Sequence, residues 1–412
     1  MSLDRFQRIR EIYAKACLLA PALRARFIAA DVVPADIRTA DDLNRLPVLK
    51  KESLMAQQQA APPFGGYLAC EPHEISHIYV SPGPIFEPSL AEDATGHGMS
   101  MMFAAAGLGP GDLALNTWSY HLVPAGLLFE QGLRAVGAAV IPSGTGNTDL
   151  QADLLLKLPV TAFLGSTAFF ETVIARLESQ GHSLPQSWQL RHAFLGGELG
   201  DWAGKRRRLE AAYGIRTWSL YGTADFGLIG YEQDGLDGYL IHPERYVQIC
   251  DPLSGVPLPA GAAGEIVVTT LSRGWPMIRF GTGDVSTALK IGADGGVAQI
   301  TPLQGRVGQA VKAREIFIYP SHVEALPQRV AGLRRASATV RRNGNRDEVV
   351  LQAVLAADAS TDAVDAALRQ VFVGLTRLQL DRIEIVSDAI LPEGAPLLTD
   401  LRHASPEKAV SD

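Results

Sequence analysis

The stretch from Gly264 to Asp284 reads GEIVVTTLSRGWPMIRFGTGD and is the part of the chain that best defines its fold. β-branched residues dominate Glu265 to Leu271, which predicts a buried strand. Ser272 to Pro276 predicts a turn, and Met277 to Phe280 a second short strand, followed by a polar loop that closes on Asp284. This interpretation places one carboxylate at a strand end, where open α/β sheets bind their ligands.

The bulk composition describes an ordinary globular protein. The chain has 412 residues, of which 47% are hydrophobic and 20% charged, enough for one large domain and a smaller one. Its net charge of −7 argues against a protein that binds nucleic acid through counterion release, and no basic run suits an anionic membrane surface. No apolar run is long enough to span a bilayer, and three widely spaced cysteines fit reduced thiols in a cytoplasm.

Helical periodicity is clearest near the amino terminus. Residues 5–30 form a helical pattern that breaks at Pro21, and residues 41–54 read as a helix, a proline-containing loop and the start of another helix. Lys50 and Lys51, at that second start, are expected to be surface charges without a chemical role. A further helix is expected over residues 94–106, followed by alternating strands and helices typical of βαβ units.

The stretch from Gly264 to Asp284 resembles the ribose-binding strand and loop of the phenylacetate-CoA ligase family of adenylate-forming enzymes. In that family the aspartate at the Asp284 position holds the ribose hydroxyls of ATP or AMP. The resemblance covers essentially the whole chain. It implies an α/β fold in which a large amino-terminal adenylate-forming domain of layered sheets and helices (1–304) is followed by a hinge (305–309) and a small α+β cap domain (310–412).

The segment HIYVSPGPIFEP, His77 to Pro88, lies where the family carries its glycine- and hydroxyl-rich phosphate loop. Ser81 and Gly83 match the family pattern, but the lysine is replaced by Glu87. Because this replacement removes the donor groups of the lysine and adds a negative charge, such a loop should hold ATP poorly. The alternative is that backbone N–H groups and Mg²⁺ alone hold the phosphates.

Two further segments resemble the adenine and metal sites of the family. Gly196, Gly197 and Glu198 end a predicted strand and match the wall of the adenine site. In TWSLYGTADF the resemblance implies that Tyr221 stacks on adenine, that Gly222 and Thr223 lie at the nucleotide, and that Asp225 replaces the glutamate that binds Mg²⁺. Aspartate can ligate Mg²⁺, although its carboxylate reaches about one methylene less far.

The carboxylate-substrate pocket is expected at two other strand ends. Trp118, Tyr120 and His121 follow one predicted strand, and Ser166 in FLGSTAFF ends another. An aromatic cluster of this kind is as readily a piece of core as a pocket wall. The resemblance implies the pocket.

The carboxy-terminal part departs most from the family. In GRVGQAVKAREIFIYPSHVE, residues 305–324, Arg306 would reach the ribose, and Lys312 sits where some relatives place a lysine for the second half-reaction. The family's catalytic lysine near the end of the chain has no counterpart in LPEGAPLLTDLR, because the aligned residue is Ala395 or Gly394.

The resemblance implies an enzyme that activates an aryl or aliphatic carboxylate as acyl-AMP with ATP and Mg²⁺ and passes it to CoA or another acceptor. Its binding partners would be small molecules, and the chain could also form a homodimer. The alternative is a paralogue that binds AMP, an acyl-adenylate or CoA without efficient adenylation. The sequence contains no G-x-S-x-G elbow, which argues against a serine hydrolase of that type.

Overall fold

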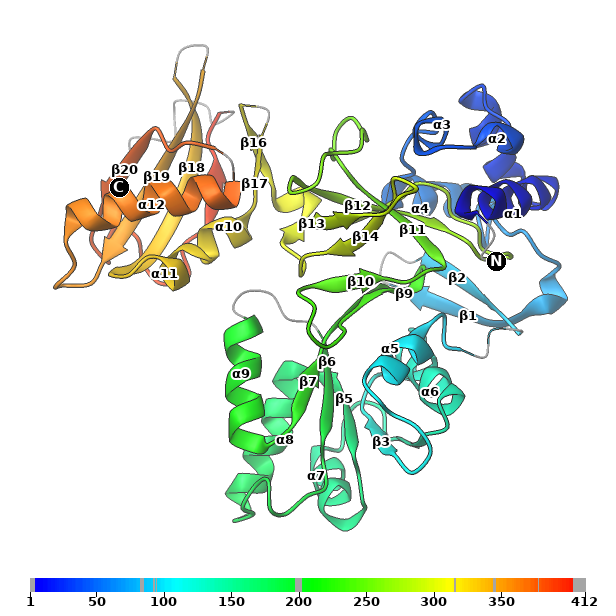
Figure 1. The fold of residues 1–412 in the computed structure, drawn as a ribbon, viewed down its shortest axis with the longest axis horizontal. Coiled ribbons are helices and arrows are strands. Elements are labelled where there is room, and N and C mark those ends of the chain that lie inside the picture. Colours follow the sequence, from blue (N-terminus) through cyan, green and yellow to red (C-terminus); the bar gives the residue numbers. More distant parts are fainter. Residues whose placement is uncertain are drawn as a thin grey trace. The chain divides into compact units, whose positions relative to one another are not determined.

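The computed structural model describes residues 4–81, 85–91, 93, 95–196, 202–314, 316–343, 346–376 and 378–402. The chain divides into two compact units (Figure 1). The first comprises Met1–Glu198 and Ala203–Pro302, and the second comprises Leu199–Trp202 and Leu303–Asp412. Within the described part, no helix is both long and apolar enough to cross a membrane.

The first unit opens with short helices, as the amino-terminal periodicity predicts. The break at Pro21 separates the first two of them, because proline is well tolerated at the first position of a helix but not in its interior. The helical elements of this part of the chain are α1 (Arg5–Leu19), α2 (Pro21–Ala29), η1 (Pro34–Asp36), α3 (Ala40–Asn44), α4 (Lys51–Ala60) and η2 (Pro72–Glu74).

A five-stranded parallel sheet forms the middle of the first unit, with strand order β4-β3-β5-β6-β7. Its strands alternate with helices, so each strand is joined to the next one along the chain by a helical crossover. The elements are α5 (Met99–Ala105), β3 (Leu113–Asn116), α6 (Ala125–Ala135), β4 (Ala139–Pro142), α7 (Thr148–Lys157), β5 (Ala162–Ser166), α8 (Thr167–Ser179), β6 (His192–Gly196), α9 (Trp202–Tyr213) and β7 (Arg216–Trp218). The strand order reverses between β3 and β5, which makes that point of the sheet's carboxyl edge the expected ligand site.

An antiparallel sheet completes the first unit and runs in the order β11-β12-β13-β14-β10-β9-β8. A separate hairpin pairs β1 with β2. The strands are β1 (Ile75–Ser81), β2 (Ile85–Leu90), β8 (Leu220–Thr223), β9 (Gly227–Tyr231), β10 (Tyr239–Ile241), β11 (Arg245–Cys250), β12 (Ala263–Thr270), β13 (Phe280–Ile291) and β14 (Val297–Ile300). The predicted strand at residues 265–271 is therefore confirmed as β12.

Two expectations about these elements were wrong for the same reason. The helix expected over residues 94–106 begins only at Met99, because His97 has a left-handed backbone between two left-handed glycines. The strand expected from Met277 begins only at Phe280, because Arg279 is left-handed with φ +47°. Neither residue is a glycine, so nothing in the local sequence indicated the conformation.

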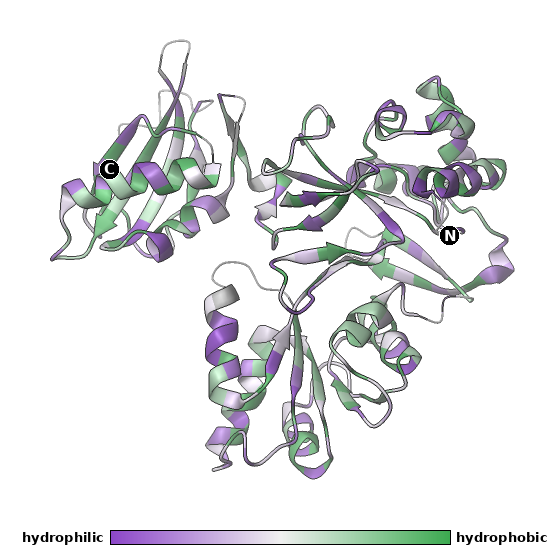
Figure 2. Cartoon of the chain, viewed as in Figure 1, coloured by the Kyte–Doolittle hydropathy of each residue, from purple (hydrophilic) through white to green (hydrophobic). Residues whose placement is uncertain are grey.

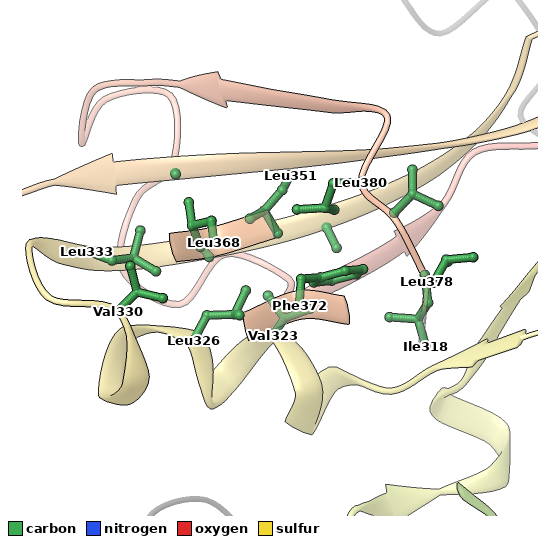
Figure 3. Packing of buried hydrophobic residues seen from close by; sticks show 14 of the residues in the cluster. Ile318, Val323, Leu326, Val330, Leu333, Leu351, Leu368, Phe372, Leu378 and Leu380 are labelled. Atoms are coloured by element: carbon green, nitrogen blue, oxygen red, sulfur yellow. The ribbon is translucent and has the colours of Figure 1, made fainter. Parts of the chain in front are cut away.

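The second unit is α+β, as expected. Its main sheet has the order β20-β19-β18-β21, and α12 packs its apolar face on the core (Figure 3). Its elements are β15 (Gly305–Arg306), η3 (Val307–Gln309), β16 (Val311–Ala313), β17 (Ile316–Ile318), α10 (Pro320–Glu324), α11 (Leu326–Arg329), β18 (Leu333–Asn343), β19 (Arg346–Leu355), α12 (Thr361–Thr376), β20 (Arg382–Ile385) and β21 (Leu398–Asp400). Buried Val364, Leu368 and Phe372 recur every four residues along α12, which appears in Figure 2 as alternating hydrophobic and hydrophilic bands.

Candidate functional site

The expected substrate-pocket residues lie at the reversal point of the parallel sheet. Trp118 follows β3, and Ser166 ends β5, where its side chain accepts a hydrogen bond from the Phe169 N–H and caps α8. Gly196 ends β6 directly against Trp118, since a Cβ there would lie 3.2 Å from the indole. The indole can approach the strand this closely because position 196 has no side chain.

Tyr120 and His121 differ in their surroundings. Tyr120 is half-buried, and its hydroxyl accepts a hydrogen bond of 2.8 Å from Asn116 Nδ2. Burial, with the Glu130 carboxylate nearby, raises the pKa of Tyr120, so the hydroxyl stays protonated. His121 is exposed, so of the two only Tyr120 is held in a fixed position.

The structure brings Tyr221 and Asp284 together across 63 residues of sequence. The Tyr221 hydroxyl donates to Asp284 Oδ2 over 3.1 Å, from a side chain that is almost fully buried in β8. Burial and the Asp284 carboxylate together raise the Tyr221 pKa well above its ordinary value. Tyr221 is therefore a fixed neutral donor that orients one carboxylate oxygen.

Contrary to the prediction from sequence, Asp284 lies inside the long strand β13 and not in a loop at a strand end. The pairing register of β12 and β13 explains how Asp284 can still project toward a ligand. Val285 pairs with Glu265 and Gly281 with Val267, so residues 282–284 bulge out opposite Ile266 alone. Gly283 makes this bulge with φ +75°, and its N–H donates to Glu265 Oε1.

The residues that resemble a phosphate loop form, where they are described, the end of a β-hairpin. Ser81 pairs with Ile85 at the turn, and Glu87 lies within β2, paired with Tyr79. Gly83 lies outside the described residues. The Glu87 side chain is almost fully buried, and Ser81 donates a hydrogen bond of 2.8 Å to its Oε1.

Glu87 lies beside Asp225, the carboxylate expected at the metal position. Burial, then the neighbouring Asp225 charge, raises the pKa of Glu87 to about 8, while Ser81 and Lys51 oppose that rise. Glu87 is thus predominantly protonated at neutral pH and does not present the negative charge that the sequence suggested.

Lys50 and Lys51 are not free surface charges, and that expectation was wrong. Lys51 Nζ lies 3.3 Å from Asp225 Oδ2, and Lys50 pairs with Glu265, whose carboxylate is buried. Backbone bonds from Leu49 to both Arg279 and Gly281 fix the start of α4 beside β13 and so deliver both lysines. Lysines at the N-cap and first position of a helix oppose its dipole, and this unfavourable pattern was the sequence signal that they have partners elsewhere.

The Lys50 pair provides a stability prediction. Lys50→Met should destabilise the protein by about 2 kcal/mol, because it leaves the Glu265 carboxylate buried without its cation; the part exposure of Lys50 keeps the loss below that of a fully buried pair. Chemical denaturation of both proteins measures the difference. Lys157→Met, which removes an exposed pair with Asp153, is the control and should change stability by less than about 1 kcal/mol. Equal effects of the two substitutions would contradict a structural role for Lys50.

The donor set fits one magnesium ion held jointly with phosphate. Asp225 Oδ1 is buried, and the Glu87 carboxyl beside it becomes a ligand only when it loses its proton, which a bound cation would favour. Magnesium typically takes one or two carboxylates and completes its shell with phosphate oxygens and water. Across the residues that the structure describes, no group of three or more His, Cys, Asp or Glu side chains could bind a metal by itself.

Other expected site residues are only partly placed. Gly222 is required by the tight turn from β8 to β9, since a Cβ there would lie 2.6 Å from the Gly227 carbonyl oxygen. Thr223 follows it with a buried hydroxyl that has no partner among described groups. Gly197 and Glu198 lie outside the described residues. In the second unit Arg306 is exposed in β15. Lys312 lies in β16, and the Lys312 side chain is not among those described.

A cavity of about 490 Å³ in the first unit reaches this cluster and was not predicted from the sequence. Glu87 and Asp225 form part of its wall, together with His97, Arg245 and Trp275. These residues come from distant parts of the chain and follow no local motif. The cavity is large enough for a small organic ligand.

Comparison with known proteins agrees with the resemblance seen in the sequence. No protein-family model matches the chain. It is 26% identical over 364 residues to a phenylacetate-coenzyme A ligase from Thermus thermophilus, covering 84% of this chain and 79% of that protein. It is 28% identical over 330 residues to the phenylacetate-coenzyme A ligase of Escherichia coli (strain K12), covering 77% of this chain and 74% of that one.

A solved structure supports the fold. An open conformation of 2-hydroxyisobutyryl-CoA ligase, in complex with 2-HIB-AMP and CoA, superposes with a TM-score of 0.80. The match is 23% identical in sequence and covers 93% of this chain and 87% of that one. The expected α/β architecture of layered sheets and helices with an α+β carboxy-terminal part is thereby confirmed.

Proposed function

We propose that this homologue of the phenylacetate-CoA ligases activates a carboxylate as an acyl-adenylate and transfers the acyl group to CoA. The observation that carries the proposal is the Tyr221–Asp284 pair beside Asp225 in one unit of the fold. It unites two segments that resemble nucleotide-binding motifs but are 63 residues apart. The similarity to proteins named as CoA ligases supports the same chemistry.

In this proposal Asp284 accepts hydrogen bonds from the ribose hydroxyls. Both carboxylate oxygens are needed to accept from the two hydroxyls. The hydrogen bond from the Tyr221 hydroxyl holds the carboxylate in one orientation for them. Trp118, Tyr120 and Ser166, with Gly196 opposite Trp118, form the pocket for the organic part of the carboxylate, at the reversal point of the parallel sheet. His121, being exposed, lies at its rim.

Lys51 supplies the cation that the sequence lacks at the phosphate loop. Its Nζ sits at the Asp225 carboxylate, and its side chain is about one quarter exposed, so it can move to a phosphate without leaving the site. Asp225 would hold Mg²⁺ through its unpartnered Oδ1. The ion would supply charge neutralisation at the phosphates, while Lys51 and Asp225 fix the position of the reacting phosphoryl group.

The second unit serves the second half-reaction in this proposal. Residues 305–309 would act as a hinge, and Arg306 and Lys312 would face the adenylate and the acceptor in turn. Gly308 suits a hinge because glycine has the greatest backbone freedom of any residue. Three buried, unbridged cysteines among the described residues are consistent with a reducing cytoplasm, which we propose as the location.

A second candidate function is binding of AMP or an acyl-adenylate without efficient adenylation. Two observations favour it. Glu87 stands where the family has a lysine, and the carboxy-terminal segment presents Gly394 and Ala395, not a lysine, between Leu391 and β21. One preorganised donor in a transition state is worth about 10²–10³ in rate, so the loss of such a lysine would slow adenylation by about that factor.

Product formation tests the two functions. The chain is incubated with MgATP, CoA and a panel of aryl and short aliphatic carboxylates, and acyl-CoA is measured by mass spectrometry. The ligase proposal expects ATP-dependent acyl-CoA from at least one carboxylate. Tight AMP binding without acyl-CoA or acyl-AMP from any of them would instead support the second candidate.

Lys51→Met should weaken MgATP binding about tenfold and AMP binding by much less, because the lost cation faces the phosphates that AMP lacks. Calorimetric titration with each nucleotide measures both. Lys205→Met removes a partly exposed pair with Glu171 in the same unit and is the matched control, because Lys205 is about as exposed as Lys51. Equal loss for both nucleotides would place Lys51 away from the outer phosphates.

A further inference from the structure

Three polar side chains near the end of β2 form a hydrogen-bonded series that the adenylation chemistry does not use. Ser89 Oγ lies 3.0 Å from His97 Nε2, and His97 Nδ1 lies 3.1 Å from Asp93 Oδ2. An ionised carboxylate can only accept, so His97 Nδ1 carries the proton and Nε2 is left as the acceptor for the Ser89 hydroxyl. The order is that of a nucleophile, a base and an orienting acid.

The backbone at His97 is strained and firmly held. His97 has φ +51° and lies between Gly96 at +65° and Gly98 at +92°. A left-handed residue other than glycine costs about 1–3 kcal/mol and persists only where its surroundings impose it. Here Asp93 Oδ2 also accepts from the His97 N–H over 2.9 Å, and the Leu228 N–H donates to the His97 carbonyl over 3.2 Å.

The series borders the cavity of about 490 Å³. Asp93 and His97 line it, as do Pro88 and Leu90 on either side of Ser89. Burial lowers the pKa of His97, so the ring is neutral and can accept a proton at neutral pH. Ser89 itself is only 2% exposed and does not line the cavity directly, so only a small group could reach its hydroxyl from there.

A cation lies in the same wall. Arg245 is almost fully buried and lines the cavity, and its Nη2 lies 3.5 Å from the His97 carbonyl oxygen. Its Nε is buried without a hydrogen-bond partner among the described groups. An unsatisfied guanidinium N–H costs free energy unless something accepts from it, and an oxyanion would.

We propose that Ser89, His97 and Asp93 form a second reactive site, in which Ser89 accepts the acyl group of short acyl esters and thioesters. His97 takes the Ser89 hydroxyl proton, Asp93 positions His97, and Arg245 Nε donates to the carbonyl oxygen as it gains charge. The narrow access to Ser89 favours acetyl-sized groups over long or aromatic ones.

The proposed step balances without a further reactant. The Ser89 oxygen forms a bond to the acyl carbon, the C–S or C–O bond to the leaving group breaks, and the proton taken by His97 passes to that leaving sulfur or oxygen. Water then attacks the acyl-serine with His97 as base, which releases the carboxylic acid and restores Ser89. ATP takes no part, so this site stands independently of the proposed ligase.

The test uses the full-length chain in a buffer without nucleotide. The protein is treated with diisopropyl fluorophosphate and, separately, with p-nitrophenyl acetate and acetyl-CoA, then studied by intact mass and by peptide mapping. We expect one adduct per chain on Ser89 and release of nitrophenol and of free CoA. Ser89→Ala and His97→Gln should each reduce the rate by at least about 10²-fold, with unchanged circular dichroism.

Ser100→Ala is the control, because Ser100 lines the same cavity and makes no hydrogen bond to any histidine in the described part of the chain. It should keep both the adduct and the rate. Absence of any adduct on the folded wild-type chain, or an adduct on a residue other than Ser89, would overturn the proposal. Since the mapping is done on the wild-type protein, this outcome does not depend on whether a variant folds.

Discussion

Replacing Glu87 with glutamine is expected to remove most of a pH-dependent loss of stability between about pH 4.5 and pH 8. Burial and Asp225 raise the pKa of Glu87 to about 8 from its ordinary value of 4.5. Between these values the unfolded chain loses the proton while the folded chain keeps it, so the unfolded state binds fewer protons. Stability therefore falls as pH rises through this window and levels off above it.

The size of this effect follows from the shift. A rise in pKa from 4.5 to about 8 corresponds to roughly 5 kcal/mol, which is a large part of the stability of a typical domain. The stability of Glu87→Gln relative to wild type should rise by that order from pH 4.5 to pH 8. Urea denaturation at several pH values in a chelating buffer measures the difference.

A surface carboxylate provides the control for Glu87. Glu52→Gln, at an exposed position in the first turn of α4, should leave the pH dependence of stability unchanged. Parallel stability curves for Glu87→Gln and wild type across the window would show that Glu87 is ionised in the folded protein. In that case the hairpin would indeed present a negative charge to a phosphate.

Asp284→Asn is expected to weaken AMP binding by about 10²-fold with little change in overall stability. Hydrogen bonds to a charged group are worth about 1.5–3 kcal/mol each, and the ribose presents two hydroxyls to one carboxylate. Asparagine keeps the shape of the side chain and the Tyr221 contact but removes the charge. Calorimetric titration with AMP measures the loss.

Two further variants make the Asp284 result specific. Tyr221→Phe removes only the orienting donor and should weaken AMP by no more than about tenfold. Asp149→Asn, an exposed helix residue paired with Arg176, should have no effect. A folded Asp284→Asn variant that binds AMP as tightly as wild type would remove Asp284 from the ribose site.

Elements with strong local patterns were predictable from the sequence. The β-branched run at β12 and the break before α2 each follow from residue type and spacing alone. The left-handed conformations of His97 and Arg279 were not predictable from the sequence, because contacts with distant parts of the chain, and not the preferences of these residues, impose them. Each one displaced a predicted boundary by several residues.

The chemistry of the site was predictable only in part. Tyr221 and Asp284 could be named from motifs, but the bulge that lets a mid-strand aspartate project depends on the register of β12 and β13. Glu87 read as a repulsive charge because its burial beside Asp225 is a long-range property. Lys51 read as solvent-exposed because its partner lies 174 residues away in sequence.

Carboxylate-dependent exchange of labelled pyrophosphate into ATP tests the central claim most directly, because it reports adenylate formation without requiring the acceptor. The carboxylate that gives the most acyl-CoA is used, and the whole panel is used if no carboxylate gives acyl-CoA. We expect the exchange to require Mg²⁺, and its rate to fall at least about 10²-fold in Asp284→Asn. Tight binding of AMP with no exchange above background for any carboxylate would contradict the ligase and leave a protein that binds adenylates without making them.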